Sequence, residues 1–104
     1  MANWEIIDTG CQSAKKNMCF DAQLLENADT FSKPVLHFYE WEGENATYGY
    51  FTDPSKLLNL DQVRKLCLQL ARRPTGGGIV FHIWDLAFSV MVPATCPEFS
   101  LKNP

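Results

Sequence analysis

The chain has 104 residues, of which 46% are apolar and 20% charged, and its 12 acidic and 9 basic residues give a formal net charge of −3. This length fits one domain with a hydrophobic core, and the composition excludes a disordered or fibrous protein. The charged residues are spread along the chain without a basic patch, so we expect no nucleic-acid partner. The longest apolar run, 79–92, is interrupted by polar residues and is too short to span a membrane, so we expect no membrane partner. The first residues lack a signal peptide, which predicts a cytoplasmic protein.

The N-terminal part of the chain predicts a strand followed by a helix. Residues 4–8 form a partly β-branched run that a Thr-Gly pair closes as a turn. Ser13 is a suitable N-cap, and apolar residues recur at helical spacing from there to about Ala28. Asn17 and Asp21 lie one turn apart on the flank of this predicted helix.

Two aromatic-rich strands and a second helix are predicted next. Residues 35–39 and 46–51 are the strand candidates, separated by an acidic loop. Behind an N-cap candidate, Asp61, apolar residues repeat at i, i+3, i+4 and i+7 from Val63 to Leu70, which favours a short helix.

The last third predicts two more strands and an irregular tail. Residues 79–83 and 86–92 are strand candidates that suggest a hairpin around Trp84-Asp85. Three prolines in residues 93–104 make either a helix or a central strand unfavourable there. No internal repeat appears, so a single domain over residues 1–104 is expected.

The four cysteines are expected to be reduced thiols without a chemical role. Their spacing suits neither a zinc ribbon nor a redox motif, and a domain with this apolar content does not need disulfides. Each is interpreted as a small hydrophobic or surface residue, and none is predicted to be a nucleophile. They are Cys11, Cys19, Cys67 and Cys96.

The most informative segment is a glycine loop that follows two arginines. Three consecutive glycines, 76–78, allow backbone N–H groups to approach a ligand, and Arg72 and Arg73 add donors suited to a carboxylate or phosphate. A glycine-rich turn with two solvated arginines fits the same composition equally well. The P-loop and the dinucleotide fingerprint are excluded, because neither spacing of glycines is present.

Residues 72–82, Arg-Arg-Pro-Thr-Gly-Gly-Gly-Ile-Val-Phe-His, resemble the R-R-x-[ST]-G-G-G-x-V-x-H signature of the lipoate–protein ligase A family and its octanoyltransferase relatives. The resemblance covers nearly the whole chain and identifies it as the N-terminal part of such a domain. Supporting segments occur in the family's order: the opening Trp4 strand ending at Gly10, Asn17-Met18-x-x-Asp21-x-x-Leu24-Leu25, Phe38-Tyr39-x-Trp41, Gly49-Tyr50-Phe51, and Leu86-x-x-Ser89-Val90.

The resemblance implies a fold and a reaction. The fold would be an α/β (α+β) domain, part of a biotin/lipoate protein ligase catalytic domain related to class II aminoacyl-tRNA synthetases, with a mixed or antiparallel sheet and flanking helices. Family ligases adenylate lipoate with ATP, with Mg²⁺ as a candidate ion, and pass the lipoyl group to a lysine. The acceptors would be lipoyl domains of 2-oxoacid dehydrogenase complexes or the glycine cleavage H protein.

The resemblance also implies roles for the loop. Arg73 would contact the nucleotide phosphate, where preorganised donors stabilise developing negative charge; residues 76–78 would cradle the acyl-adenylate and residues 79–81 would line the site. His82 either supports the loop by a hydrogen bond or packs as a structural histidine, and it is not assigned as a base. The candidate substrate- and nucleotide-binding residues are Arg72, Arg73, Thr75, Gly76, Gly77, Gly78, Ile79, Val80, Phe81 and His82.

The chain departs from the family pattern in its catalytic residue. Family members place an essential lysine, or in some transferases a cysteine, well after the loop. Lys102 fits no family motif, and Cys96 follows the loop too closely to match the transferase cysteine. No catalytic residue is therefore assigned. Smaller departures are Ala22, Thr52 and Ile83 at positions where the family has an acidic residue, glutamine and aspartate, with Asp85 as a partial replacement for the last.

Three functions are consistent with these features. The preferred one is a lipoate–protein ligase-type domain that is catalytically incomplete without a C-terminal complement. The second is an octanoyltransferase fragment, which Pro74-Thr75 and the segment 86–90 resemble slightly more closely. The third is a non-catalytic binding or assembly module that pairs an unfinished sheet edge with a partner or with itself.

Overall fold

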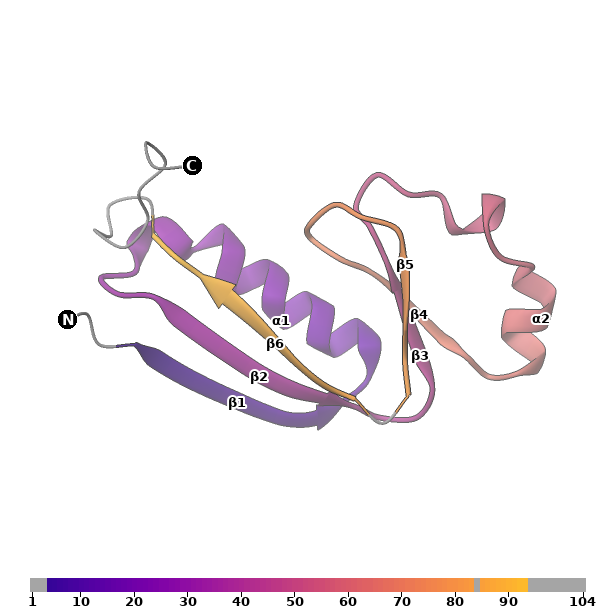
Figure 1. Cartoon of the computed structure of the whole chain (residues 1–104), viewed down its shortest axis with the longest axis horizontal. Coiled ribbons are helices and arrows are strands. Elements are labelled where there is room, and N and C mark those ends of the chain that lie inside the picture. The colour runs from indigo at the N-terminus through magenta and orange to yellow at the C-terminus, as the bar shows by residue number, and fades with distance from the viewer. Residues whose placement is uncertain (1–3, 84, 94–104) are drawn as a thin grey trace.

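The computed structural model describes residues 4–83 and 85–93. They form two three-stranded sheets and one long helix, α1, that lies along the first sheet and reaches the second (Figure 1). The expected α/β (α+β) fold is confirmed. In chain order the elements are β1 (Glu5–Gln12), α1 (Ala14–Glu26), β2 (Val35–Trp41), β3 (Asn45–Tyr48), α2 (Leu60–Lys65), β4 (Gln69–Arg72), β5 (Ile79–His82) and β6 (Leu86–Met91), with 3-10 turns at Ala28–Thr30 and Pro54–Lys56.

Both sheets are mixed. The first has the order β1-β2-β6, with β1 parallel and β6 antiparallel to the central strand β2. The second has the order β4-β3-β5, with β4 parallel and β5 antiparallel to β3. The predicted hairpin is wrong, because β5 pairs with β3 in the second sheet whereas β6 pairs with β2 in the first.

Strand β1 continues past the predicted turn. The pairing of β1 with β2 shifts register between Asp8 and Cys11, so the Thr-Gly pair forms an irregularity inside the strand. Gly10 has a φ of 72°, which a glycine adopts without steric cost, and its N–H donates to the Asp8 carboxylate at 2.9 Å. The strand therefore resumes and ends at Gln12.

Helix α1 begins as predicted. The Ser13 hydroxyl accepts a hydrogen bond from the Lys16 N–H at 3.2 Å, and the helix ends at Glu26, two residues before the predicted limit. Asn17 and Asp21, which lie one turn apart as expected, are both buried. Asn17 Nδ2 donates to the carbonyl oxygens of Gln12 and Glu40, which ties the helix to the ends of β1 and β2.

The second helix is shorter than predicted. Its N-cap is Asn59, whose side chain accepts from two backbone N–H groups, rather than Asp61. The helix stops at Lys65, and Cys67 adopts a φ of 55° that turns the chain away. Leu70 consequently lies in β4, a strand that the helical periodicity concealed.

The core lies between α1 and the strands next to it. Its buried members are Ala14, Met18, Tyr39, Trp41 and Ala71, with Ala87 packed against them. The described cysteines 11, 19 and 67 are exposed free thiols outside this core. Within the described ranges, no helix is long and apolar enough to cross a membrane. The predicted tail beyond Pro93, with Cys96 and Lys102, and the side chain of Trp84 lie outside the described residues.

Candidate functional site

The glycine loop, residues 73–78, connects β4 to β5 and is docked on the end of β3. Three backbone hydrogen bonds hold it: Arg73 N–H donates to Tyr48 O at 2.8 Å, Tyr50 N–H to Thr75 O at 2.9 Å, and Gly49 N–H to Gly78 O at 3.1 Å. The loop is thus fixed against residues 48–50, and the third predicted strand ends at Tyr48 because the chain turns there to meet it.

Glycine is required at two of the contact points. A Cβ on Gly49 would lie 2.0 Å from the carbonyl oxygen of Gly77, and Gly77 itself has a φ of 117°. The hydroxyl of Thr52 donates to the same Gly77 carbonyl at 2.8 Å. A Cβ on Gly76 or Gly78 would meet nothing within 4 Å, so these two positions face open space.

Arg73 binds the loop from within. Its guanidinium donates to the Thr47 hydroxyl at 2.8 Å and to the carbonyl oxygens of Gly78 at 2.7 Å and Gly76 at 3.3 Å. A guanidinium carries five N–H donors in a fixed fork, so these three bonds leave donors for a ligand. The side chain predicted to contact phosphate therefore also organises the loop in this structure.

Arg72 points elsewhere. Its guanidinium lies 4.9 Å from the centre of the Tyr48 ring and donates to the Tyr50 carbonyl. It borders a groove between α1 and β4 that also includes Lys15 and Cys19, away from Arg73. We had interpreted the two adjacent arginines as one group of donors. They serve different surfaces, because Arg72 is the last residue of β4 whereas Arg73 bonds to the loop that begins there.

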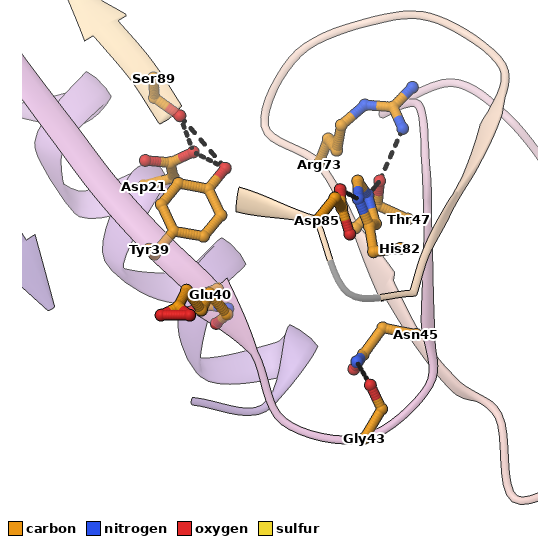
Figure 2. A network of polar contacts seen from close by, with 11 residues as sticks. Asp21, Tyr39, Glu40, Gly43, Asn45, Thr47, Arg73, His82, Asp85 and Ser89 are labelled. Atoms are coloured by element: carbon orange, nitrogen blue, oxygen red, sulfur yellow. Dashed lines mark hydrogen bonds and ion pairs between the residues drawn. The ribbon is translucent and has the colours of Figure 1, made fainter. Parts of the chain in front are cut away.

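His82 supports the loop through a chain of hydrogen bonds. Its ring is buried and stacks on Trp41, with centroids 3.9 Å apart. His82 Nε2 lies 3.0 Å from the Thr47 hydroxyl, and Nδ1 lies 2.8 Å from the Asp85 carboxylate. A guanidinium only donates and a carboxylate only accepts. When the imidazole carries its proton on Nδ1 alone, the donors run in one direction from Arg73 through Thr47 and His82 to Asp85 (Figure 2).

That chain agrees with the expectation that His82 supports the loop, and the ring is at the same time packed. It also gives Asp85 a defined role. Asp85, which was expected to replace in part an aspartate at position 83, lies within hydrogen-bond distance of the His82 ring.

A second polar cluster, centred on Asp21, was not among the predicted site residues. One carboxylate oxygen accepts from His37 Nδ1 at 2.8 Å. The other accepts from the hydroxyls of Ser89 at 2.5 Å and Tyr39 at 3.2 Å (Figure 2). His37 is fully buried, and its Nε2 lies 2.7 Å from the Thr9 hydroxyl. The cluster links α1 to all three strands of the first sheet.

Burial, reinforced by the nearby Asp21 charge, raises the pKa of Tyr39 to about 12, although the hydrogen bond with Ser89 acts in the opposite direction. The phenol therefore remains a neutral donor near physiological pH. The signal that could have found this cluster was the Asn17–Asp21 spacing, because polar residues one turn apart beside an apolar stripe also fit a buried network.

A cavity of about 330 Å³ opens between α1, the edge of β6 and the glycine loop. Its volume lies within the range of small-molecule sites, roughly 300–1,000 Å³. Most of the lining is apolar, and polar groups from the Asp21 cluster and from the loop border it. The lining residues are Met18, Asp21, Leu25, Tyr39, Arg73, Pro74, Thr75, Phe88, Ser89, Val90 and Met91.

The structure brings only part of the predicted site to this cavity. Arg73 and Thr75 line it, whereas residues 79–81 do not. Val80 and Phe81 are exposed on β5, an edge strand of the second sheet. Whether residues 76–82 contact a ligand stays a prediction.

Metal ligands do not gather in the described part of the chain. No group of three His, Cys, Asp or Glu side chains there could hold a metal ion. The loop segment 72–82 itself contains no carboxylate. The Mg²⁺ expectation therefore stays a prediction.

Known protein families give an independent comparison. The model of the lipoyl protein ligase A/B catalytic domain matches residues 13–103. The octanoyltransferase LipM of Lysinibacillus sphaericus is 39% identical over 99 residues, which cover 94% of this chain and 36% of the relative. The chain thus spans about a third of the length of such relatives and corresponds to the N-terminal part of a longer family member.

Three solved structures with a similar fold are described as lipoate–protein ligases, the first of them as a putative one. Protein Ta0514 of Thermoplasma acidophilum with bound lipoic acid has a TM-score of 0.71 and 31% identity, over 86% of this chain and 36% of that one. A lipoate–protein ligase A bound with ATP has a TM-score of 0.68 and 32% identity over the same shares. A bi-partite lipoate protein ligase from Thermoplasma acidophilum, solved in a study that included its E2 lipoyl domain, has a TM-score of 0.68 and 28% identity, again over 86% and 36%.

Proposed function

Because the chain belongs to the lipoyl protein ligase A/B catalytic domain family, we propose that it supplies the acyl-binding part of an octanoyltransferase-type catalytic domain. The observation that carries the proposal is the cavity between α1, β6 and the glycine loop. Similarity to octanoyltransferases over almost the whole chain supports the transferase over the ligase.

The cavity has the features that a medium-length acyl chain needs. Met18, Leu25 and Met91 supply apolar contacts for the hydrocarbon. Arg73 and Thr75 stand at the loop side, where the free donors of Arg73 can meet the carbonyl oxygen of the acyl group. The Asp21 cluster holds α1 and β6 together across the cavity, which keeps this wall fixed.

The chain's own residues would bind and orient the acyl group rather than transfer it. Preorganised donors at the loop suit an oxygen that gains negative charge during acyl transfer. The nucleophile and its base would come from a C-terminal complement, because no residue of this chain matches the family's catalytic lysine or cysteine. The acceptor would be a lipoyl domain of a 2-oxoacid dehydrogenase complex or the glycine cleavage H protein, and the cytoplasm the place of reaction.

A lipoate–protein ligase is the second candidate, and the similarity to a ligase bound with ATP favours it. In that case Arg73 would also meet the nucleotide phosphate. The two candidates differ in the acyl donor, because a transferase takes an octanoyl thioester whereas a ligase needs lipoate and ATP.

Calorimetry on the 104-residue chain tests both. An octanoyl-pantetheine thioester should bind without nucleotide, and Leu25→Trp, at a cavity-lining leucine that is 44% exposed, should weaken binding at least tenfold. Leu57→Trp, at an exposed leucine outside the cavity, is the matched control and should bind as the unaltered chain does. Equal binding by both variants would refute the cavity assignment, and binding of lipoate only with a non-hydrolysable ATP analogue would favour the ligase.

A further inference from the structure

One face of the first sheet has no cover in the described part of the chain. Helix α1 packs on the face that carries Tyr39 and the other buried residues of β2. The opposite face is here called the open face. Residues paired across neighbouring strands lie on the same face, and the register pairs Ile6 with Leu36, Leu36 with Val90, and Phe38 with Phe88. Its apolar members are Ile6, Leu36, Phe38, Leu86, Phe88 and Val90.

The open face is a continuous apolar patch. Ile6 is 62% exposed and Leu86 63% exposed at opposite corners of the sheet, and the Phe38 and Phe88 rings lie 6.3 Å apart between them. Single apolar side chains on a surface are ordinary, but a contiguous patch of this kind marks an interaction site. A sheet with one covered face normally buries the other against a further layer when that face is apolar.

The charges on this face restrict what can cover it. Asp8 and Glu40 point to the same side as the apolar stripe, because their register partners are Phe38 and Leu86. The residues of the face include no lysine or arginine. A second copy placed face to face would oppose these carboxylates with its own and would supply no basic side chain. The partner that fits this face is therefore apolar, with basic residues next to Asp8 and Glu40.

The length of the relatives indicates where such a partner comes from. The matched segment makes up 36% of the Lysinibacillus sphaericus octanoyltransferase, so the larger part of that protein lies outside it. We propose that the open face docks the portion of the family's domain that follows the matched segment, through an amphipathic element with basic residues next to Asp8 and Glu40. This proposal rests on the proposed function, in which a C-terminal complement supplies the catalytic residues.

Co-expression of the tagged chain with the C-terminal portion of the Lysinibacillus sphaericus relative tests the docking. We expect a one-to-one complex, measured by light scattering after size exclusion. Leu86→Asp should weaken it at least tenfold, whereas Leu57→Asp, at a leucine that is also 63% exposed but lies outside the open face, should not. Ile6→Asp is a second variant on another strand, and circular dichroism checks that each variant is folded.

Phe88 and Val90 also border the cavity, so Leu86 and Ile6, which do not, separate docking from acyl binding. Octanoyl-thioester binding by the isolated Leu86→Asp chain should equal that of the unaltered chain. Absence of a complex, a complex that Leu86→Asp and Ile6→Asp leave unchanged, or a homodimer formed through this face would overturn the docking proposal. If the unaltered chain did not bind the thioester, the proposed function would be overturned instead.

Discussion

The Cα hydrogen of Gly49 faces the carbonyl oxygen of Gly77 so closely that a Cβ at this position would lie 2.0 Å from that oxygen. The contact joins the turn after β3 to the glycine loop, which is also held by the bond from the Gly49 N–H to the Gly78 carbonyl. Gly49→Ala should therefore displace the loop, lower the free energy of unfolding by about 1–3 kcal/mol and weaken acyl binding. Thermal unfolding and calorimetry measure the two effects.

Gly76→Ala is the matched control for that substitution. Its Cβ would meet nothing within 4 Å, and its φ lies outside the left-handed region. The variant should have the same free energy of unfolding as the unaltered chain. If Gly49→Ala and Gly76→Ala behaved alike, close packing of the loop on the β3 turn would not be the reason for the glycine.

Arg73→Lys should loosen the loop although it keeps the positive charge. A lysine amino group cannot reproduce the fork that reaches Thr47, Gly76 and Gly78 together. The amide hydrogens of Gly49 and Tyr50, which bond to loop carbonyls, should then exchange at least tenfold faster with deuterium. Arg64→Lys on α2 is the control, and unchanged exchange in Arg73→Lys would mean that the backbone bonds alone hold the loop.

Local signals in the sequence predicted the elements well but not their partners. The Ser13 cap and the β-like runs near 35–39, 79–83 and 86–92 all correspond to observed elements, because capping and strand patterns are encoded by neighbouring residues. The failure at β5 and β6 has a physical cause. A hairpin pattern does not specify whether the chain reverses or crosses to another sheet, and that choice depends on which strands have free edges.

The candidate site was likewise predicted from the sequence only in part. The glycine loop was predicted because its residue types are unusual, whereas the burial of Asp21 depends on strands that arrive later in the chain, including Ser89 on β6. Leu70 shows the same limit. Its spacing fits the periodicity of a helix, but it lies in β4, which pairs in parallel with β3. Residues fixed by long-range contacts are the ones that periodicity cannot assign.

Asp21→Asn should destabilise the chain strongly. The Asp21 carboxylate accepts hydrogen bonds from His37, Tyr39 and Ser89 in a buried setting. An amide has one acceptor oxygen and would turn its N–H groups toward the His37 ring or the two hydroxyls. These buried partners would then have to change tautomer or rotamer or lose a bond, which should lower the free energy of unfolding by about 1–3 kcal/mol. Urea denaturation measures it, with the exposed Asp8→Asn as control; a loss as small as that of Asp8→Asn would refute the buried network.

Tyr39 should make stability depend on pH in the alkaline range. Burial raises the pKa of Tyr39 to about 12, against 10.0 for an unperturbed phenol, so the unfolded chain loses this proton first. The stabilisation from the neutral phenol is complete below about pH 10 and is lost as the pH rises through about 12. The difference in free energy of unfolding between the unaltered chain and Tyr39→Phe, which cannot titrate, should therefore shrink over this interval.

Urea titrations from about pH 9 to 12 measure that difference, because lysines and exposed tyrosines titrate equally in both proteins and cancel. Tyr50→Phe, at an exposed tyrosine, supplies the control for removing a tyrosine hydroxyl from the surface. A constant difference for Tyr39→Phe over the whole interval would mean that the Tyr39 phenol is not held neutral by its surroundings, and that the hydroxyl beside Asp21 is open to solvent.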